Sequence, residues 1–116
     1  MDHVAARVAM NQARFREANE EIEPRAVIAG VERVPFICEC ADPNCTKIIR
    51  VTIREYEKVR AESVLFLNAP GHEVHSGDYS EVESRNERYV VTRKIGDAAK
   101  IGESLDAREG DDADAA

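Results

Sequence analysis

Three cysteines lie within eight residues of this chain, in the pattern Cys38-Glu39-Cys40-Ala41-Asp42-Pro43-Asn44-Cys45, and no other cysteine occurs. Thiolate sulfur binds soft and borderline metal ions, and Zn²⁺ takes four sulfur or nitrogen ligands in a tetrahedron. An odd number of tightly clustered cysteines favours metal or redox chemistry over a disulfide framework. The cluster therefore predicts a metal site around which the chain must fold.

The spacing of the cysteines also predicts the local backbone. Cys38 and Cys40 would point to opposite faces of a strand, so both can bind one ion only if the chain turns there. Asp42-Pro43-Asn44 supplies residues typical of a turn. The apolar run before Cys38 and the alternating β-branched residues of 48–53 predict two strands. We therefore expect a β-hairpin of the zinc-knuckle type with the cysteines at its tip.

The fourth ligand has two candidates downstream. His72 follows Pro70-Gly71, a rigid turn that could aim its imidazole inward, whereas His75 lies three residues further in a polar stretch. Water, or no protein ligand, is the remaining alternative. We favour His72, which gives a predicted set of Cys38, Cys40, Cys45 and His72 around one Zn²⁺ per chain.

Residues 3–22 predict an amphipathic helix, which Pro24 should end. Its expected buried stripe consists of Val4, Val8, Asn11, Phe15, Ala18 and Ile22. In one interpretation the helix packs on its own domain. In the other it pairs with a partner or a second copy of the chain, and Asn11 helps to set the register.

The rest of the chain predicts a small α+β fold. Thr52 and Glu55 fit a capping box that begins a short central helix over residues 53–61. Residues 64–67 are expected to form a buried strand or turn, residues 79–86 a loop or short helix, and residues 88–95 a C-terminal strand in a small antiparallel sheet. Residues 97–105 are expected to add a last helical turn or two. We divide the chain into an N-terminal helix (1–24), a metal-binding domain (25–105) and a disordered acidic tail (106–116).

Composition limits the classes of function. A chain of 116 residues without Trp builds only a lean core, which a structural metal would support. The net charge of −7 offers no basic surface for nucleic acid, and no apolar run is long enough to cross a membrane. The first residues do not have the pattern of a secretory signal, so we expect a cytoplasmic protein.

Two catalytic patterns are approached but not matched. His72-Glu73-Val74-His75 places its histidines three residues apart, whereas zinc proteases need them four apart on one helix. The zinc deaminase pattern needs a Pro-Cys-x-x-Cys segment after its histidine, and the chain has none.

Several segments together resemble a group of small bacterial proteins with no assigned biochemical activity. The resemblance covers roughly residues 14–108, and it rests on the segments 15–19, 36–45, 55–60, 66–73 and 88–91. It implies a Cys3His site in which Cys38, Cys40, Cys45 and His72 match the recurring positions, and it does not include His75. Pro24 and residues 26–31 depart from the group, which leaves the end of the first helix open.

Four functions fit these observations. The first is a small zinc-binding protein whose zinc is structural and whose role is interaction or regulation, as a monomer or as a homodimer through the N-terminal helix, with a protein partner possible. The second is a [2Fe–2S] protein, although the Cys-Asp-Gly-Ser-His signature of one such family is missing. The third is a thiol redox sensor in which Cys38 and Cys40 form a disulfide and release the metal. The fourth is an enzyme with an open zinc site, in which Glu39, Glu73 or His75 acts as the base.

Overall fold

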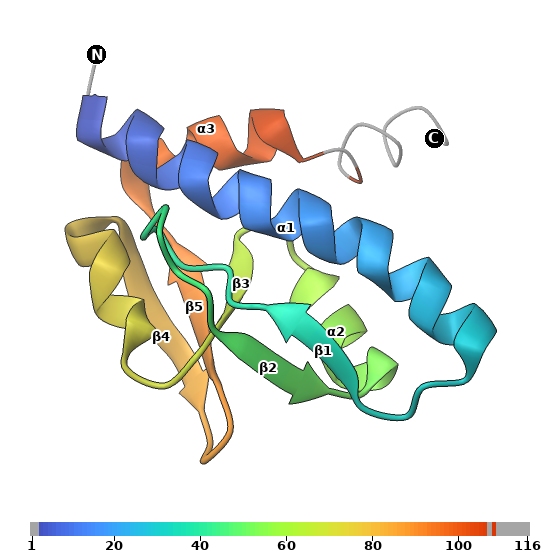
Figure 1. Cartoon of the computed structure of the whole chain (residues 1–116). Coiled ribbons are helices and arrows are strands. Elements are labelled where there is room, and N and C mark those ends of the chain that lie inside the picture. Colours follow the sequence, from blue (N-terminus) through green and yellow to red (C-terminus); the bar gives the residue numbers. More distant parts are fainter. Residues whose placement is uncertain (1–2, 107, 109–116) are drawn as a thin grey trace.

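The computed structural model describes residues 3–106 and residue 108, and it has the predicted α+β architecture (Figure 1). The long helix α1 crosses over a two-stranded hairpin and a three-stranded sheet, and α3 lies beside it. The elements in chain order are α1 (His3–Ala29), β1 (Val34–Ile37), β2 (Ile48–Val51), α2 (Ile53–Arg60), β3 (Leu65–Asn68), the 3-10 helix η1 (His72–Tyr79), β4 (Ser80–Arg85), β5 (Val90–Lys94) and α3 (Gly96–Leu105).

Helix α1 continues past Pro24 to Ala29, so the prediction that Pro24 ends it is wrong. The helix ends at Gly30, which has a φ of 71°. The backbone N–H of Gly30 donates to Val27 O (3.2 Å) and that of Val31 donates to Ala26 O (3.1 Å). These two bonds form a Schellman motif, which satisfies carbonyl groups that the helix end leaves free. Burial of Ala26 in the core holds the turn after Pro24 against the rest of the fold.

The buried face of α1 is rotated from the predicted stripe. Val4 is 56% exposed, whereas Gln12, Arg16 and Asn19 are buried. Polar side chains can take core positions only where they find partners, and both Arg16 and Asn19 bind residues of the cysteine region. Asn11, expected to set a register between helices, donates instead to Ala41 O of the same chain (2.8 Å).

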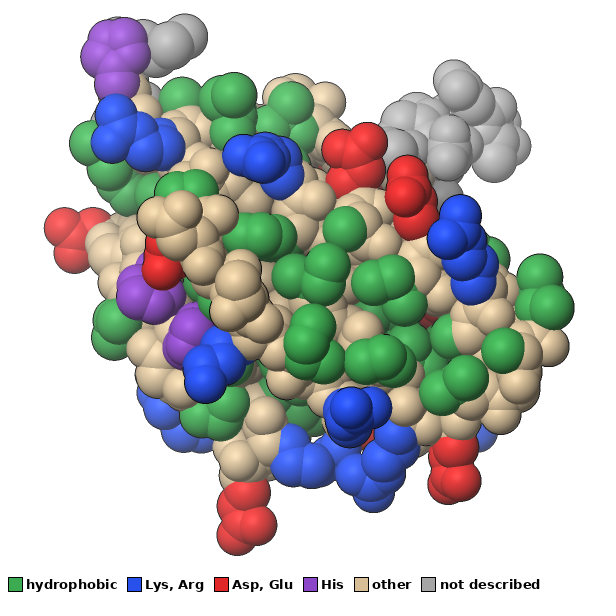
Figure 2. All heavy atoms as spheres, viewed as in Figure 1, with side chains coloured by type: hydrophobic (Ala, Val, Ile, Leu, Met, Phe, Trp, Pro, Cys, Tyr) green, Lys and Arg blue, Asp and Glu red, His purple; other side chains and the backbone are tan. Residues whose placement is uncertain are grey.

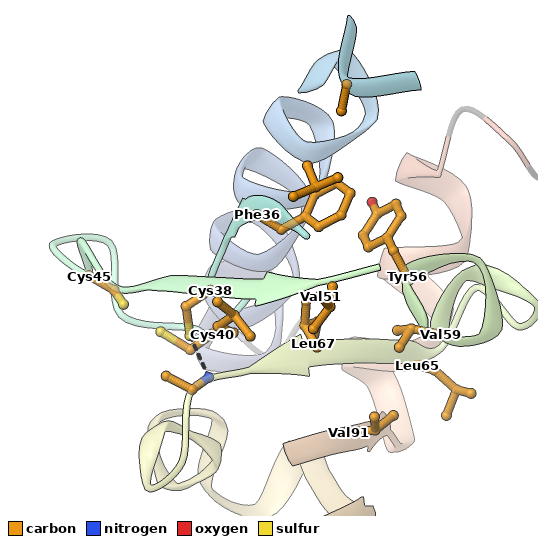
Figure 3. Close-up of a cluster of buried hydrophobic side chains, with 14 residues drawn as sticks. Phe36, Cys38, Cys40, Cys45, Val51, Tyr56, Val59, Leu65, Leu67 and Val91 are labelled. Carbon is orange, nitrogen blue, oxygen red and sulfur yellow. Dashed lines mark hydrogen bonds between the residues drawn. The ribbon is translucent and has the colours of Figure 1, made fainter. Parts of the chain in front are cut away.

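The β1–β2 hairpin forms as predicted, in the antiparallel register that pairs Val34 with Val51 and Ile37 with Ile48. Phe36 on β1 stacks on Tyr56 of α2, with ring centroids 4.1 Å apart (Figure 3). On the face shown in Figure 2, hydrophobic side chains gather below α1, with charged side chains around them. Phe36, Tyr56 and Leu67 of β3 belong to one cluster of buried side chains, so the hairpin and α2 share a core with β3.

The predicted capping box of α2 is confirmed. Thr52 Oγ1 accepts from the Glu55 N–H (3.1 Å), and the Thr52 N–H donates back to Glu55 Oε1 (3.0 Å). This reciprocal pair satisfies two donors at the start of the helix.

The three-stranded sheet has the order β3-β5-β4, and all its neighbours are antiparallel. The predicted strand at 88–95 is confirmed as β5, and the predicted helical turns after it as α3. The loop or short helix expected at 79–86 is wrong, because Ser80–Arg85 forms β4. This strand is mostly exposed, so its sequence lacks an apolar face. Backbone pairing with β5 and an ion pair from Glu83 to Arg93 (2.8 Å) hold it in place.

Within the described residues, no helix is long and apolar enough to span a membrane. Two residues of the predicted acidic tail are described, and both are held by ion pairs: Asp106 binds Arg60 (2.8 Å) and Arg108 binds Glu57 (2.7 Å). Residues 107 and 109–116 of that predicted tail lie outside the described residues.

Candidate metal centre

The loop between β1 and β2 carries all three cysteines and is closed by backbone hydrogen bonds. The N–H of Cys38 donates to Lys47 O (3.0 Å), which joins the two sides of the loop. At its tip, the N–H of Cys45 donates to Asp42 O (3.1 Å), and Asp42 Oδ1 accepts from the Asn44 N–H (2.9 Å). The Asp-Pro-Asn turn expected from the sequence thus folds Cys45 back toward the other two sulfurs.

A second turn brings His72 to the cysteines. Strand β3 runs beside the cysteine loop, since the Glu39 N–H donates to Leu67 O (2.7 Å). The chain then turns at Gly71, whose φ of 89° suits glycine, and the His72 N–H donates to Ala69 O (3.0 Å). The imidazole therefore faces the loop tip across a gap of 27 positions in sequence.

The four potential ligand atoms converge on one point. Nδ1 of His72 lies 3.8 Å from Cys38 Sγ, 3.7 Å from Cys40 Sγ and 3.3 Å from Cys45 Sγ. All four ligand atoms lie within 4.8 Å of one another. An ion with bonds of about 2.3 Å to sulfur and 2.0 Å to nitrogen in a tetrahedron holds sulfur and nitrogen about 3.5 Å apart. The observed separations fit such an ion.

Burial and mutual contact perturb the thiols. The pKa of Cys40 is lowered to about 5, chiefly by a hydrogen bond from the Cys38 thiol, although burial opposes this shift. The pKa of Cys38 is raised, because its thiol donates to Cys40 and because the group is buried. Burial also raises the pKa of Cys45. Without a cation the cluster holds one thiolate readily and resists the others, so a bound metal ion would replace protons at the remaining sulfurs.

Backbone donors surround the sulfurs. The Ala69 N–H donates to Cys38 Sγ at 3.2 Å, which is the dashed line in Figure 3. Backbone hydrogen bonds from Asp42 and Lys47 act on Cys40 and Cys45 respectively, and each lowers the pKa of its thiol. Such donors orient ligands and offset the negative charge of several thiolates around one ion.

The second candidate histidine, His75, stands apart from this cluster. It is exposed, and its ring lies edge-on to that of His72 with centroids 5.0 Å apart. Among the described residues, the group able to hold a metal contains His72 and the three cysteines but not His75.

Glu39, named in the sequence only as a possible base of an open site, has a different place in the structure. Its side chain is fully buried. Oε1 accepts from Arg16 Nη2 (3.0 Å) and from the Leu67 N–H (3.1 Å). Oε2 accepts from Asn19 Nδ2 (3.0 Å) and from the Tyr56 hydroxyl (3.5 Å). Glu39 therefore ties the cysteine loop to α1, α2 and β3.

Sequence reasoning missed the partners of Glu39. Arg16 is 4% exposed, donates to Ser63 O (2.9 Å) and Leu65 O, and stacks on the Phe66 ring. Asn19 donates to Ile37 O (2.8 Å) and accepts from the Ile37 N–H (2.7 Å). The available signal was the helical spacing of Gln12, Arg16 and Asn19, which places polar residues together on one face of α1.

These features define the chain as a small α+β protein with a Cys3His group at metal-binding distance. No protein-family model matches the chain, and no curated protein or solved structure matches it significantly.

Proposed function

We propose that the protein binds one Zn²⁺ per chain through Cys38, Cys40, Cys45 and His72, and that this zinc is structural. The observation that carries the proposal is the convergence of four ligand atoms of types that zinc prefers. Three thiolates favour zinc or iron–sulfur chemistry over the hard cations that prefer oxygen ligands.

A closed site supports a structural role over a catalytic one. Structural zinc sites fill all four positions with protein atoms, whereas catalytic sites keep one position for water or substrate. The candidate general base Glu39 is fully buried and already accepts hydrogen bonds at both oxygens. A carboxylate engaged in this way is poorly placed to take a proton from a metal-bound water.

The position of the site explains what the metal would do. It would fasten the hairpin tip to the turn before η1, two segments otherwise joined by few backbone bonds. The core of this chain is small, and a structural zinc site contributes roughly 10–16 kcal/mol of apparent binding energy. We infer that the fastened surface acts in interaction or regulation, with a protein partner or a second copy of the chain.

Metal analysis of the purified protein tests the proposal. We expect one zinc per chain without added metal, a colourless protein, and loss of the hairpin structure in a strong chelator. If the analysis finds iron and acid-labile sulfide, the site holds a [2Fe–2S] cluster and the assignment of zinc is wrong. A folded chain with well under one metal ion of any kind would overturn the proposal.

His72 and His75 offer a matched pair of variants. His72→Ala should lower zinc affinity by roughly tenfold or more, since one of the four proposed ligands is lost. His75→Ala changes the same residue type three positions away and should retain zinc fully. Competition with a coloured zinc chelator measures both. If the two variants retain zinc equally well, His72 is not a ligand.

A further inference from the structure

A cavity lies away from the cysteine cluster, between α1, α3 and the sheet. Its volume is about 350 Å³. Phe66 of β3 and Lys94 of β5 line it together with Met10 of α1 and Leu105 of α3. Ligand sites in proteins are mostly apolar cavities of ~300–1,000 Å³ with a few polar groups. The size and lining therefore suit a small organic molecule.

Lys94 is the unusual member of this lining. It is only 2% exposed, and its Nζ has no hydrogen-bond partner among the described residues. The ammonium group lies 4.1 Å from the centre of the Phe66 ring, a contact that only partly replaces hydration. Buried cations in proteins are normally paired, because an unpaired charge in an apolar site is costly. An acceptor is therefore missing at this position.

Arg16 adds a second donor without an acceptor. Its Nη atoms bind Glu39 and backbone oxygens, but its buried Nε has no partner within the part of the chain that the structure describes. Its guanidinium carbon lies 3.7 Å from the centre of the same Phe66 ring that Lys94 contacts. The Nε atom of Arg16 and the Nζ atom of Lys94 thus belong to two residues that line one cavity.

Nearby carboxylates do not fill this need. Asp106 accepts from Nη1 and Nη2 of Arg60, each at 2.8 Å, and lies 3.8 Å from Arg16 Nη1. Glu20 accepts from Arg60 (3.1 Å) and from the Tyr56 hydroxyl (3.1 Å). Asp106 and Glu20 are therefore already engaged by other donors, and neither carboxylate hydrogen-bonds Lys94 Nζ.

The walls limit the kind of anion that fits. Met10 and Leu105, 56% and 47% exposed, offer apolar surface beside the buried charge. Gly102 of α3 gives the ammonium room, since a Cβ there would lie 2.6 Å from Lys94 Nζ. Glu17 and Glu20 also line the cavity and would repel a second negative charge. One negative group on an apolar body satisfies all these features.

We propose that this cavity binds a small monocarboxylate with an apolar chain, whose carboxylate accepts from Lys94. The chain of the ligand packs against Phe66, Met10 and Leu105. The carboxylate supplies the acceptor that Lys94 lacks, and the apolar chain covers surface that α1 and α3 leave open. Binding at this cavity does not depend on the metal proposal, because none of the four potential metal ligands lines it.

Titration of the full-length, metal-containing protein with octanoate, followed by calorimetry and backbone amide NMR, tests the proposal. We expect saturable binding, with shifts centred on α1, α3 and β5. Octanol has the same chain without the charge. It should bind about tenfold to a hundredfold more weakly, since a hydrogen bond to a charged group strengthens binding by about that factor. Binding of octanol as tight as that of octanoate, or no saturation by octanoate, would overturn the proposal.

Two lysine variants locate the carboxylate. Lys94→Met should lower octanoate affinity by about tenfold or more, while Lys100→Met removes an exposed lysine from α3 and should leave it unchanged. Far-ultraviolet circular dichroism confirms that each variant is folded, and Lys94→Gln provides a second neutral side chain that can still donate. Wild-type affinity in both Lys94 variants would refute the assignment.

The pH dependence gives an independent readout. Burial and the nearby Arg16 lower the pKa of Lys94 to about 7, while Glu39 and Asp106 partly oppose that shift. A carboxylate favours the protonated amine, so octanoate affinity should fall as the pH rises from 6 to 9. An affinity that stays constant over this range would contradict a contact with Lys94.

Discussion

Glu39 and Lys94 are both buried charged groups, but they differ in how many hydrogen-bond partners surround them. Glu39 is fully buried and accepts hydrogen bonds from four donors. Lys94 is 2% exposed, and within residues 3–106 and 108 its Nζ has no hydrogen-bond partner. Both groups lie near Arg16, so the difference reflects the local supply of partners.

The difference separates a structural role from a binding role. A fully satisfied buried carboxylate fixes the positions of its donors, here three elements around the cysteine loop. A buried cation without an acceptor costs stability, and such groups persist where a ligand or a reaction uses them. Glu39 therefore belongs to the framework of the cysteine loop, and Lys94 belongs to the binding site that we propose.

Removal of the Glu39 carboxylate should have the largest effect. Glu39→Ala leaves Arg16 buried without its partner, and such changes cost about 3–5 kcal/mol. Chemical denaturation of the metal-containing protein measures the loss. Glu21→Ala, which removes an exposed glutamate of α1, is the control and should not change the free energy of unfolding measurably. If both variants lose the same free energy of unfolding, Glu39 does not have the structural role that distinguishes it from Lys94.

Removal of the Lys94 charge should act in the opposite direction. The pKa of Lys94 falls from 10.5 to about 7 on folding, so protonation penalises the folded chain fully below pH 7. The penalty declines as the pH rises from 7 to 10.5 and is absent above that range. Lys94→Met should therefore stabilise the ligand-free protein at pH 6, by on the order of 1–4 kcal/mol. Parallel denaturation curves at pH 6 and pH 9 measure this, and a destabilised variant at pH 6 would contradict it.

A milder change tests how much of the Glu39 network is redundant. Tyr56→Phe removes a hydroxyl that donates to Glu20 (3.1 Å) and to Glu39 (3.5 Å). Burial raises the pKa of Tyr56, so this hydroxyl stays a donor. Glu39 keeps three other donors, and the expected loss is about 1 kcal/mol. A loss as large as that of Glu39→Ala would make Tyr56 the main support of the network.

The smallest effect is expected at Gly102, where the Lys94 side chain meets α3. Alanine stabilises a helix interior by about 0.5–1 kcal/mol relative to glycine, but its Cβ would displace the ammonium group. Gly102→Ala alone should be close to neutral, and in a Lys94→Met background it should show the full gain. Equal effects in both backgrounds, measured by thermal melting, would show that Lys94 moves aside freely.

The sequence predicted the elements whose signals are local. The Asp-Pro-Asn turn, the capping box of Thr52 and Glu55, and the β-branched strand at 48–51 each depend on neighbouring residues. The approach of His72 to the cysteines followed from the preference of zinc for four ligands, together with the turn at Gly71.

The features that were missed depend on distant contacts. Pro24 is tolerated because Ala26 packs in the core and Gly30 ends the helix with its own hydrogen bonds. Strand β4 has no apolar face, since it is mostly exposed and held by its pairing with β5. The network around Glu39 and the cavity beside Lys94 each combine residues from several elements, and spacing along the chain does not reveal such combinations.

The ion pairs of Arg108 have a consequence for the order in which segments of the chain fold during synthesis. Arg108 donates to Glu20 (3.0 Å) and Glu23 (2.9 Å) of α1 and to Glu57 of α2, which joins positions up to 88 apart. Arg16 likewise binds Ser63 and Leu65 O, and Asn19 binds Ile37. Helix α1 leaves the ribosome long before these partners exist, and its buried face is partly polar. The buried face of α1 therefore cannot pack until the later segments have been synthesised. Contacts between residues far apart in sequence also slow folding. Mutations near residue 108 should consequently affect the yield of folded chain as well as its final stability.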